Sequence, residues 1–528
     1  MTLFHTFSEA LHQSVSLRIA AALFILLVYP VSNFVYNVYF HPLAKFPGPK
    51  LWAASRLPFV FNLLRGSLIK RQRQLHEQYG PVFRMAPDEI SFANEEAWHD
   101  IYAWRKGHKR ALRDPAFAVA PEGQADNIVT TSNAKFHARV RGLVSTSFTE
   151  DSLSSQASLV ESHADMFVDQ FHRAAILPKN CENGALFDLT DWLNFFTMDV
   201  IGDLAFGESF GCLANGEYHD WVRNLYNYLK AMSIAAAPRY WPTVQFLFEK
   251  MIPRSIIEGQ RLHQKYASDR INRRLDSKSE RPDFMTPFMK KNPNFENMSR
   301  EEIISTFNFI IVGGSETSAT TMTGIFNHLL MPKNKAILNR LTREIRERYK
   351  SEDEITISAV NKPDHIYLEA VLNEGLRICH PVPSGLPRMV PEGGDEYAGV
   401  FLPEGTRLGV RTFAVNRSTK YFHKPDTFAP ERWLPEGERP SEFDGDRLSA
   451  SKPFSIGFHS CLGKPLAWLE MRLIIVRLLW AFDFAEEDGM HVEFDDFPMM
   501  MMVQKQSMMV RVRAREGVRY KGLRNEMV

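Results

Sequence analysis

Hydrophobic residues form one long block near the N-terminus. Residues 17–40 carry a single charge, Arg18, and their apolar centre runs over residues 19–29. A block of this length suits one helical crossing of a bilayer. The alternative is a cleaved signal peptide, but its apolar region would be shorter, and no small-residue cleavage site precedes the rest of the chain. We therefore expect a short lumenal segment over residues 1–16 and a transmembrane helix over residues 17–40.

A proline-rich linker follows over residues 41–50. Its prolines favour extended backbone, which would hold the rest of the chain at a set distance from the membrane. Arg18 is the only Lys or Arg before the apolar centre, whereas Lys45, Lys50 and Arg56 follow it closely. The positive-inside rule then places the large C-terminal part in the cytosol.

Beyond the linker, the spacing of apolar positions predicts mostly helices and few strands. Residues 67–79 are expected to form a short helix, and residues 82–85 and 89–92 a hairpin around Pro87-Asp88. From about residue 136 to about residue 278 the spacing is mostly helical, with breaks at proline and glycine. The expected fold class is mainly α with small β-sheets, in one catalytic domain over residues 51–528.

Composition and charge exclude some functions. The 528 residues include 63 basic and 62 acidic side chains, and no long block of like charge indicates a nucleic-acid partner. The four cysteines, Cys181, Cys212, Cys379 and Cys461, are far apart and form no CxxC pair. This spacing argues against a disulfide framework or a zinc site and is typical of a reducing compartment.

One predicted helix should cross the core. Ser299 followed by Glu302 is typical of a capped helix start. Residues 303–312 are then apolar on most faces of a helix, which indicates that the helix is buried.

The middle of this helix is unusual. Gly313 and Gly314 weaken it by about 1 kcal/mol each relative to Ala. Glu316 and Thr317 place an acid and a hydroxyl in an apolar interior, where an unpaired polar group is costly. Either a flat ligand lies against the glycines, or this is a glycine-kinked core helix whose Thr bonds back to its own backbone. Both explanations stay open at this point.

Cys461 lies where a loop of small residues meets a long apolar helix. Apolar side chains recur every three or four positions over residues 462–480, and Pro465 suits a first helical turn. We therefore expect Cys461 at a helix N-terminus, where the dipole and unpaired N–H groups lower the pKa of a thiol. Gly457 and Gly463 let backbone or a flat ligand come close. The alternative is a buried structural cysteine.

The cysteine loop resembles the haem-binding loop of the cytochromes P450, whose pattern is F-x-x-G-x-[R/H]-x-C-x-G. Phe454, Gly457, His459, Cys461 and Gly463 fill every fixed position. The resemblance implies that this loop binds haem b and that Cys461 is the axial thiolate ligand of the haem iron. Most members have Arg where this chain has His459, whose charge depends on pH.

The central helix resembles the [A/G]-G-x-[D/E]-T-[T/S] pattern of the same family. By that resemblance, Gly313 and Gly314 border the haem, and Thr317 contacts the oxygen that is being activated. Glu316 then helps to relay protons to that oxygen.

Two further motifs resemble the structural part of the family. Glu374 and Arg377 match its E-x-x-R motif, and Arg432 lies in the matching Pro-Glu-Arg-Trp element over residues 430–433. The resemblance implies a buried charge network that serves folding and haem retention.

Two arginines occupy places where the family binds the haem propionates. Arg388 follows the segment 381–387, and Arg141 ends a stretch that resembles W-x-x-x-R, with His137 in place of Trp. The alternative for Arg141 and His137 is an ordinary charged helix surface.

The resemblance as a whole implies the cytochrome P450 fold with an N-terminal transmembrane helix. The implied activity is a haem-thiolate monooxygenase that inserts one atom of O2 into a hydrophobic small molecule. Electrons would come from NADPH through NADPH-cytochrome P450 reductase, with cytochrome b5 as a further candidate partner, because no nicotinamide fingerprint is present. The expected location is the endoplasmic reticulum membrane, single-pass, with the catalytic domain facing the cytosol.

The segments 37–43 and 137–141 look like those of filamentous-fungal members, many of which tailor secondary metabolites. Two other functions stay open. The fold could catalyse isomerisation, dehydration or oxidative coupling without oxygen transfer, although Glu316 and Thr317 argue against this. The chain could also be a non-catalytic membrane protein that binds haem or acts as a scaffold.

Overall fold

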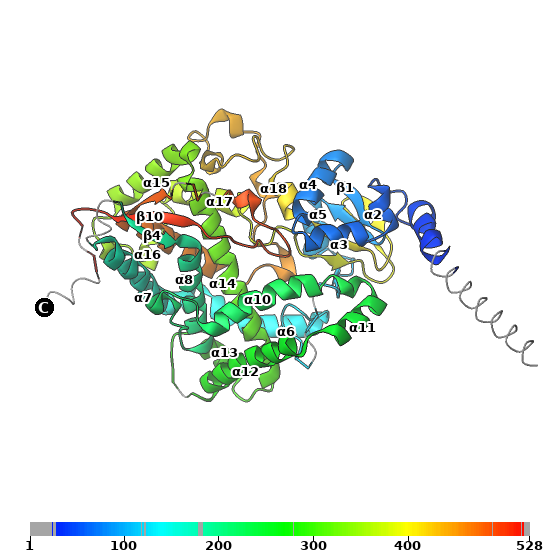
Figure 1. Cartoon of the computed structure of the whole chain (residues 1–528), viewed down its shortest axis with the longest axis horizontal. Helices are drawn as coiled ribbons and strands as arrows, with labels where there is room; N and C mark the ends of the chain where they lie inside the picture. Colours follow the sequence, from blue (N-terminus) through cyan, green and yellow to red (C-terminus); the bar gives the residue numbers. More distant parts are fainter. Residues whose placement is uncertain are drawn as a thin grey trace, which may run out of the picture.

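The computed structural model describes residues 24, 28–117, 119–120, 123–177, 183–277, 279–487, 489–490, 492–518 and 520–521. Helices make up most of the fold, with small sheets at its edges (Figure 1). The α-helices are α2 (Lys50–Ala54), α3 (Leu57–Leu64), α4 (Leu68–Tyr79), α5 (Glu96–Tyr102), α6 (Ala134–Val144), α7 (Glu150–Ala175), α8 (Leu189–Phe206), α9 (Cys212–Asn215), α10 (Asp220–Ala235), α11 (Pro242–Met251), α12 (Arg254–Asp276), α13 (Met285–Lys291), α14 (Arg300–Leu330), α15 (Lys335–Arg348), α16 (Ile357–Val360), α17 (Ile366–Ile378), α18 (Thr412–Asn416) and α19 (Lys464–Ala481).

The strands of the described residues form three sheets. The largest has the strand order β1-β2-β8-β5-β3, in which β2 and β8 are parallel, with Ile90 opposite Leu408, and the other pairs are antiparallel. The other two sheets have the orders β4-β10-β9 and β6-β7 and are antiparallel. The strands are β1 (Val82–Ala86), β2 (Glu89–Phe92), β3 (Leu112–Arg113), β4 (Ala185–Asp188), β5 (Arg388–Met389), β6 (Asp395–Tyr397), β7 (Val400–Leu402), β8 (Arg407–Val410), β9 (Phe482–Glu486) and β10 (Met509–Ala514). The predicted fold class, mainly α with small β-sheets, is confirmed.

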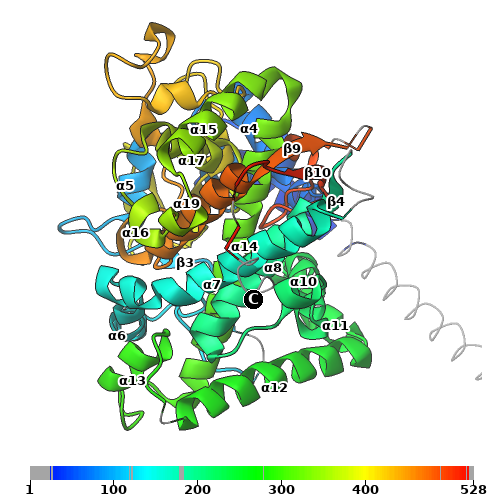
Figure 2. The ribbon, with the colours of Figure 1, turned by 90° about the vertical axis from the view of Figure 1, so that its left-hand side faces the viewer.

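The long helix α14 runs through the middle of the helical part, as Figures 1 and 2 both show. Ser299 accepts a hydrogen bond from Glu302 N–H, and the Glu302 side chain bonds back, so the predicted capping box is present. Gly314 lets α14 approach α8, because a Cβ there would lie 2.6 Å from Ile201 Cδ1. A Cβ at Gly313 would meet only Phe309, at 3.9 Å. The two glycines therefore do different things: Gly314 permits helix packing, and Gly313 leaves space.

The helix α17 also packs closely on α14. A Cβ at Gly375 would lie 2.2 Å from Ile325 Cγ1, well inside van der Waals contact. Glycine at this position therefore sets the distance between the helix that carries Glu374 and the helix that carries Thr317.

The N-terminal segment lies against the largest sheet. In the predicted linker, Pro47 O accepts a hydrogen bond from Arg84 N–H at 2.7 Å, and Leu43 is completely buried. Within the described part of the chain, no helix is both long and apolar enough to span a bilayer. Residues 1–16 and part of the predicted transmembrane segment 17–40, namely 17–23 and 25–27, lie outside the described residues.

The close packing at Gly375 leads to a test of stability. We expect Gly375→Ala to lower the free energy of unfolding by about 1 to 3 kcal/mol, because the added methyl overpacks the contact with Ile325. Gly259→Ala is the matched control: Gly259 lies in α12 with nothing within 4 Å of the added Cβ. That change should be neutral or stabilise by up to about 1 kcal/mol. Chemical unfolding of both variants measures the difference, and equal effects would contradict the packing argument.

Candidate active site

The cysteine loop reaches α19 through a short 3-10 turn, η10 (Gly457–His459). Cys461 N–H donates to Phe454 O at 2.9 Å, which closes the loop between these two positions. Gly457 has a φ of +72°, and a Cβ there would lie 2.1 Å from Tyr102 O. Glycine at this position therefore allows the loop to pack on α5. In contrast, a Cβ at Gly463 would meet only Cys461 Sγ, at 3.9 Å.

The thiol of Cys461 differs from the sequence expectation. The helix begins at Lys464, three residues after Cys461, and burial raises the pKa of the thiol instead of lowering it. The backbone N–H groups of Gly463 and Lys464 and the charge of Arg141 act in the lowering direction, but burial outweighs them. The side chain nevertheless has exposed surface.

A group of part-exposed residues lies on α14, and α14 packs against α19. Phe309, Gly313 and Thr317 recur every four residues along one face and are not fully buried, whereas α14 is buried from Ser318 to Leu329. Gly313 lies on this face, and its missing side chain leaves space beside the helix.

The acid and the hydroxyl of α14 both have partners. Thr317 donates from Oγ1 to Gly313 O at 2.6 Å, which is the backbone bond that the sequence left open as an alternative. Glu316 forms an ion pair with Lys505, with Nζ and Oε2 2.7 Å apart. Lys505 lies far away in the sequence, and nothing in its local pattern pointed to this pairing.

Two histidines and an arginine meet beside the cysteine loop. His459 Nδ1 lies 3.0 Å from His137 Nε2 and 2.9 Å from Arg113 Nη2. A guanidinium can only donate, so His459 Nδ1 accepts and this imidazole is neutral, with its proton on Nε2. Arg113 is in β3 and was missed by sequence reasoning, because a two-residue strand carries no recognisable motif.

Electrostatics favour the same protonation. Burial first, and then Arg113, lowers the pKa of both imidazoles: that of His137 falls to about 4 and that of His459 falls further below its ordinary value. Arg388 and Arg110 also lower both, and Arg141 acts on His137. His459 therefore offers a donor N–H at neutral pH without a charge of its own.

The predicted propionate donors belong to this cationic cluster. Arg141 donates to Ser460 O at 2.9 Å and to Ser460 Oγ at 3.1 Å, in the loop just before Cys461. Arg388 is buried, borders the same cleft as His459, and has a pKa lowered by burial. Arg113 Nε is buried without a hydrogen-bond partner among the described residues. Buried cations with an orphaned donor fit an anionic group, so the donor set suits the carboxylates of a haem, beside a thiol and an open glycine.

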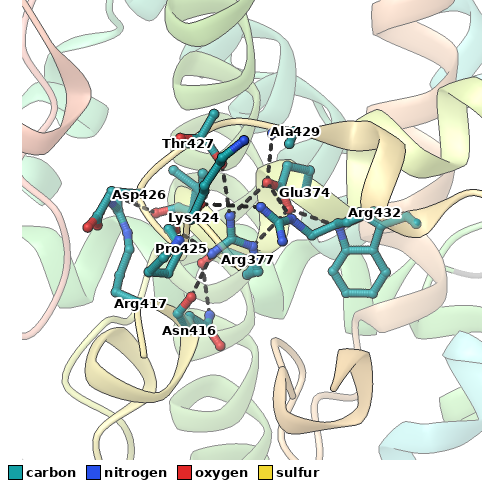
Figure 3. A network of polar contacts seen from close by, with 12 residues as sticks. Glu374, Arg377, Asn416, Arg417, Lys424, Pro425, Asp426, Thr427, Ala429 and Arg432 are labelled. Atoms are coloured by element: carbon teal, nitrogen blue, oxygen red, sulfur yellow. Dashed lines mark hydrogen bonds and ion pairs between the residues drawn. The ribbon is translucent and has the colours of Figure 1, made fainter. Parts of the chain in front are cut away.

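Glu374, Arg377 and Arg432 form a buried network of polar contacts (Figure 3). Both oxygens of Glu374 accept hydrogen bonds from Arg377, at 2.7 and 2.8 Å, and Oε1 also accepts from Arg432 Nε at 3.1 Å. All three side chains are completely buried. Arg377 also donates to the carbonyls of Asn416 and Pro425, at 2.6 and 2.7 Å. The network therefore fastens α17 to the chain around residues 416–432.

The charges in this network depend on one another. Burial would raise the pKa of Glu374, but Arg377 and Arg432 overcome it and lower the pKa to about 2. Folding lowers this pKa from its ordinary value of 4.5. The ionised carboxylate therefore stabilises the fold fully at pH values above 4.5, and this stabilisation is lost as the pH falls towards 2. Two partners were not expected from the sequence, namely Asp446, paired with Arg432, and Trp433, whose Nε1 donates to Glu374 at 2.9 Å.

The network predicts a large effect of a conservative change. We expect Glu374→Gln to lower the free energy of unfolding by about 3 to 5 kcal/mol, because Arg377 and Arg432 lose the charge that compensates them. Glu344→Gln is the matched control, since Glu344 pairs with Arg340 on the exposed surface of α15 at 2.9 Å. Its effect should stay below about 0.5 kcal/mol. Denaturant unfolding of both variants compares them, and similar losses would show that burial of the network is not decisive.

Known proteins resemble most of the chain. The family model described as Cytochrome P450 matches residues 49–512. Cytochrome P450 monooxygenase lcsI of Purpureocillium lilacinum is 40% identical over 462 residues, which cover 87% of each chain. Averantin hydroxylase of Aspergillus parasiticus is 38% identical over 456 residues, covering 86% of this chain and 88% of the relative. Cytochrome P450 monooxygenase stcF of Emericella nidulans is 38% identical over 461 residues, covering 87% and 91%. These matches confirm the predicted class of enzyme, and the chain belongs to the cytochrome P450 family.

Proposed function

We propose that the chain is a haem-thiolate monooxygenase that inserts one atom of O2 into a hydrophobic small molecule, as a tailoring step of fungal secondary metabolism. The observation that carries this proposal is the thiol of Cys461, which has exposed surface although burial raises its pKa. The cationic cluster beside it and the fungal monooxygenases that resemble the chain support the same conclusion.

The proposed cofactor is haem b. Cys461 would bind its iron through the thiolate sulfur, and Arg141, Arg388, Arg113 and His459 would bind its propionates through the donors described above. When bound, the haem supplies the redox-active iron at which O2 is reduced with electrons from a reductase. The cationic donors also neutralise the carboxylates of the cofactor, which would otherwise be buried without partners.

Residues of α14 would supply the protons that the reaction consumes. In the reaction, one C–H bond of the substrate becomes C–OH. The second oxygen atom takes up two electrons and two protons and leaves as water. Thr317 holds a proton on Oγ1 that it now donates to Gly313 O, and Glu316 is the preceding residue of the helix. We propose that Thr317 offers this proton at the reacting oxygen and that Glu316 replenishes it.

An apolar substrate suits the part-exposed face of α14. Phe309 is 38% exposed, and Ile310 and Val312 are partly exposed in a chain whose other large apolar side chains are mostly buried. One relative, averantin hydroxylase, is named for the hydroxylation of averantin. We propose that the substrate of this chain is a hydrophobic small molecule.

The proposed electron source is NADPH, used by a separate cytochrome P450 reductase, with cytochrome b5 as a second candidate partner. The proposed location is the endoplasmic reticulum membrane, with a single anchor at residues 17–40 and the catalytic domain in the cytosol. The apolar composition of that segment and the basic residues that follow it support this location.

A spectrum tests the thiolate. The reduced protein with carbon monoxide should show the shifted Soret band of a haem-thiolate, and Cys461→Ser should abolish it because the anionic sulfur is gone. Cys212→Ala is the control, since Cys212 is buried elsewhere and its change should leave the band in place. A wild-type protein that binds haem without the shifted band would contradict the proposed function.

A second change tests the proton role of α14. We expect Thr317→Ala to reduce severalfold the share of NADPH electrons that ends in product, because the hydroxyl no longer offers its proton. Thr321→Ala is the matched control, since Thr321 also bonds back along α14, to Thr317 O at 3.2 Å, but lies one turn further on. The measurement is product formed per NADPH consumed, with isotopically labelled O2. Product that carries no label would favour a reaction without oxygen transfer.

A further inference from the structure

The loop over residues 125–130 is fastened to the first half of α14. Asn127 Nδ2 donates to Ser305 Oγ at 3.1 Å, and Ser305 Oγ donates to Ala125 O at 2.8 Å. Asn127 and Ser305 are only 4% and 6% exposed, so these bonds are shielded from water. Ser305 stands four residues before Phe309 on α14. The loop therefore packs at the N-terminal end of the part-exposed face of that helix.

The side chain of Asn127 also folds the loop into a tight turn. Its Oδ1 accepts from the N–H groups of Val129 and Thr130, at 2.8 and 3.0 Å, and its own N–H donates to Thr130 Oγ1 at 3.0 Å. An asparagine that bonds to the backbone two residues further on forms an Asx-turn, which fixes the local backbone. The carbonyl of Ile128 lies inside this turn. Its position is therefore set by one side chain that is itself bonded to α14.

The carbonyl of Ile128 in turn holds Arg113 of the cationic cluster. Arg113 Nη2 donates to Ile128 O at 2.8 Å and to His459 Nδ1 at 2.9 Å. Both acceptors are uncharged. Burial, and then the charges of Arg388 and Arg141, lowers the pKa of Arg113 to about 9. A half-buried cation that its neighbours repel stays in place only where acceptors are fixed for it, so the turn over residues 127–130 decides where this guanidinium lies.

We propose that Asn127 is a positioning residue: by fastening the loop 125–130 to Ser305, it holds Arg113 beside His459 with Nε directed to a carboxylate of the cofactor. The proposal rests on the proposed function, because the carboxylate is one of the haem propionates. Arg113 Nε is buried without a hydrogen-bond partner among the described residues, and it is the donor that such a group would use. The bonds of Asn127 go to α14 and to its own loop, so its effect on the cofactor passes through Arg113.

The rate of haem transfer from the ferric holoenzyme to an excess of apomyoglobin tests this proposal without turnover. We expect Asn127→Ala to raise this rate about tenfold, as when one hydrogen bond to a charged group is weakened. Arg113→Leu should raise it at least as much, because the guanidinium itself is removed. An unchanged rate in Asn127→Ala would overturn the proposal.

The double variant Asn127→Ala/Arg113→Leu separates positioning from a general loss of structure. It should lose haem no faster than Arg113→Leu alone, since no guanidinium is left to position. Rates that multiply would show that Asn127 acts independently of Arg113. Asn292→Ala is the matched control, because Asn292 Oδ1 also accepts from two backbone N–H groups, those of Asn297 and Met298, at 3.0 and 3.2 Å. Its rate should equal that of the wild type, and an equal increase in both asparagine variants would contradict the role of Asn127.

Resonance Raman spectra of the holoenzyme give a second measurement. The bending band of the haem propionates moves when their hydrogen bonds change. It should therefore shift in the same direction in Asn127→Ala and in Arg113→Leu, and stay in place in Asn292→Ala. A band at the wild-type position in Asn127→Ala would count against the proposal.

The carbon monoxide spectrum separates the possible failures. A wild type without the shifted band overturns the proposed function, whereas intact bands with unchanged haem transfer in Asn127→Ala overturn only the role of Asn127. If Asn127→Ala yields no haem-loaded protein, Ser305→Ala takes its place, because it removes the bond to α14 and leaves the turn of Asn127 intact. The same rise in rate, with no further rise when Arg113→Leu is added, is then expected.

Discussion

The buried carboxylate of Glu374 joins the parts of the chain that lead to Cys461. It accepts hydrogen bonds from Arg377 on its own helix and from Arg432, which also pairs with Asp446, eight residues before Phe454. A buried ion is tolerated only when all its partners are in place. The network therefore ties the chain segment that leads to the cysteine loop to α17.

Beside the cysteine, the buried charges are positive, and they also need partners of opposite charge. Arg113, Arg141 and Arg388 lie partly or fully buried near His459, and the charged groups with most effect on this histidine are other cations. The chain has a neutral imidazole where most of its family has an arginine. Arg113 donates to that imidazole from a different element and brings a guanidinium to this place. Positive charge is thus gathered from several segments, as an anionic cofactor requires.

The helix α14 shows how one element serves packing and chemistry together. Gly314 lets it approach α8, whereas Gly313, one residue earlier, leaves space for a ligand. Thr317 bonds back to Gly313 O, and Glu316 is tied to Lys505. The helix is therefore held from its packing side, by α8 and the C-terminal segment, while its part-exposed face stays open.

The sequence by itself determined the features that are set by residues close to one another along the chain. The capping box at Ser299, the cysteine loop over residues 454–463 and the spacing of Glu374 and Arg377 are local patterns, so the fold class and the family followed from them. Only the tertiary structure decided which distant groups meet. Arg113 and His459 are 346 positions apart, and Lys505 and Glu316 are 189 apart, so no periodicity links them. Burial likewise reversed the expected pKa shift of Cys461, because the extent of burial comes from the whole fold and not from a helix start.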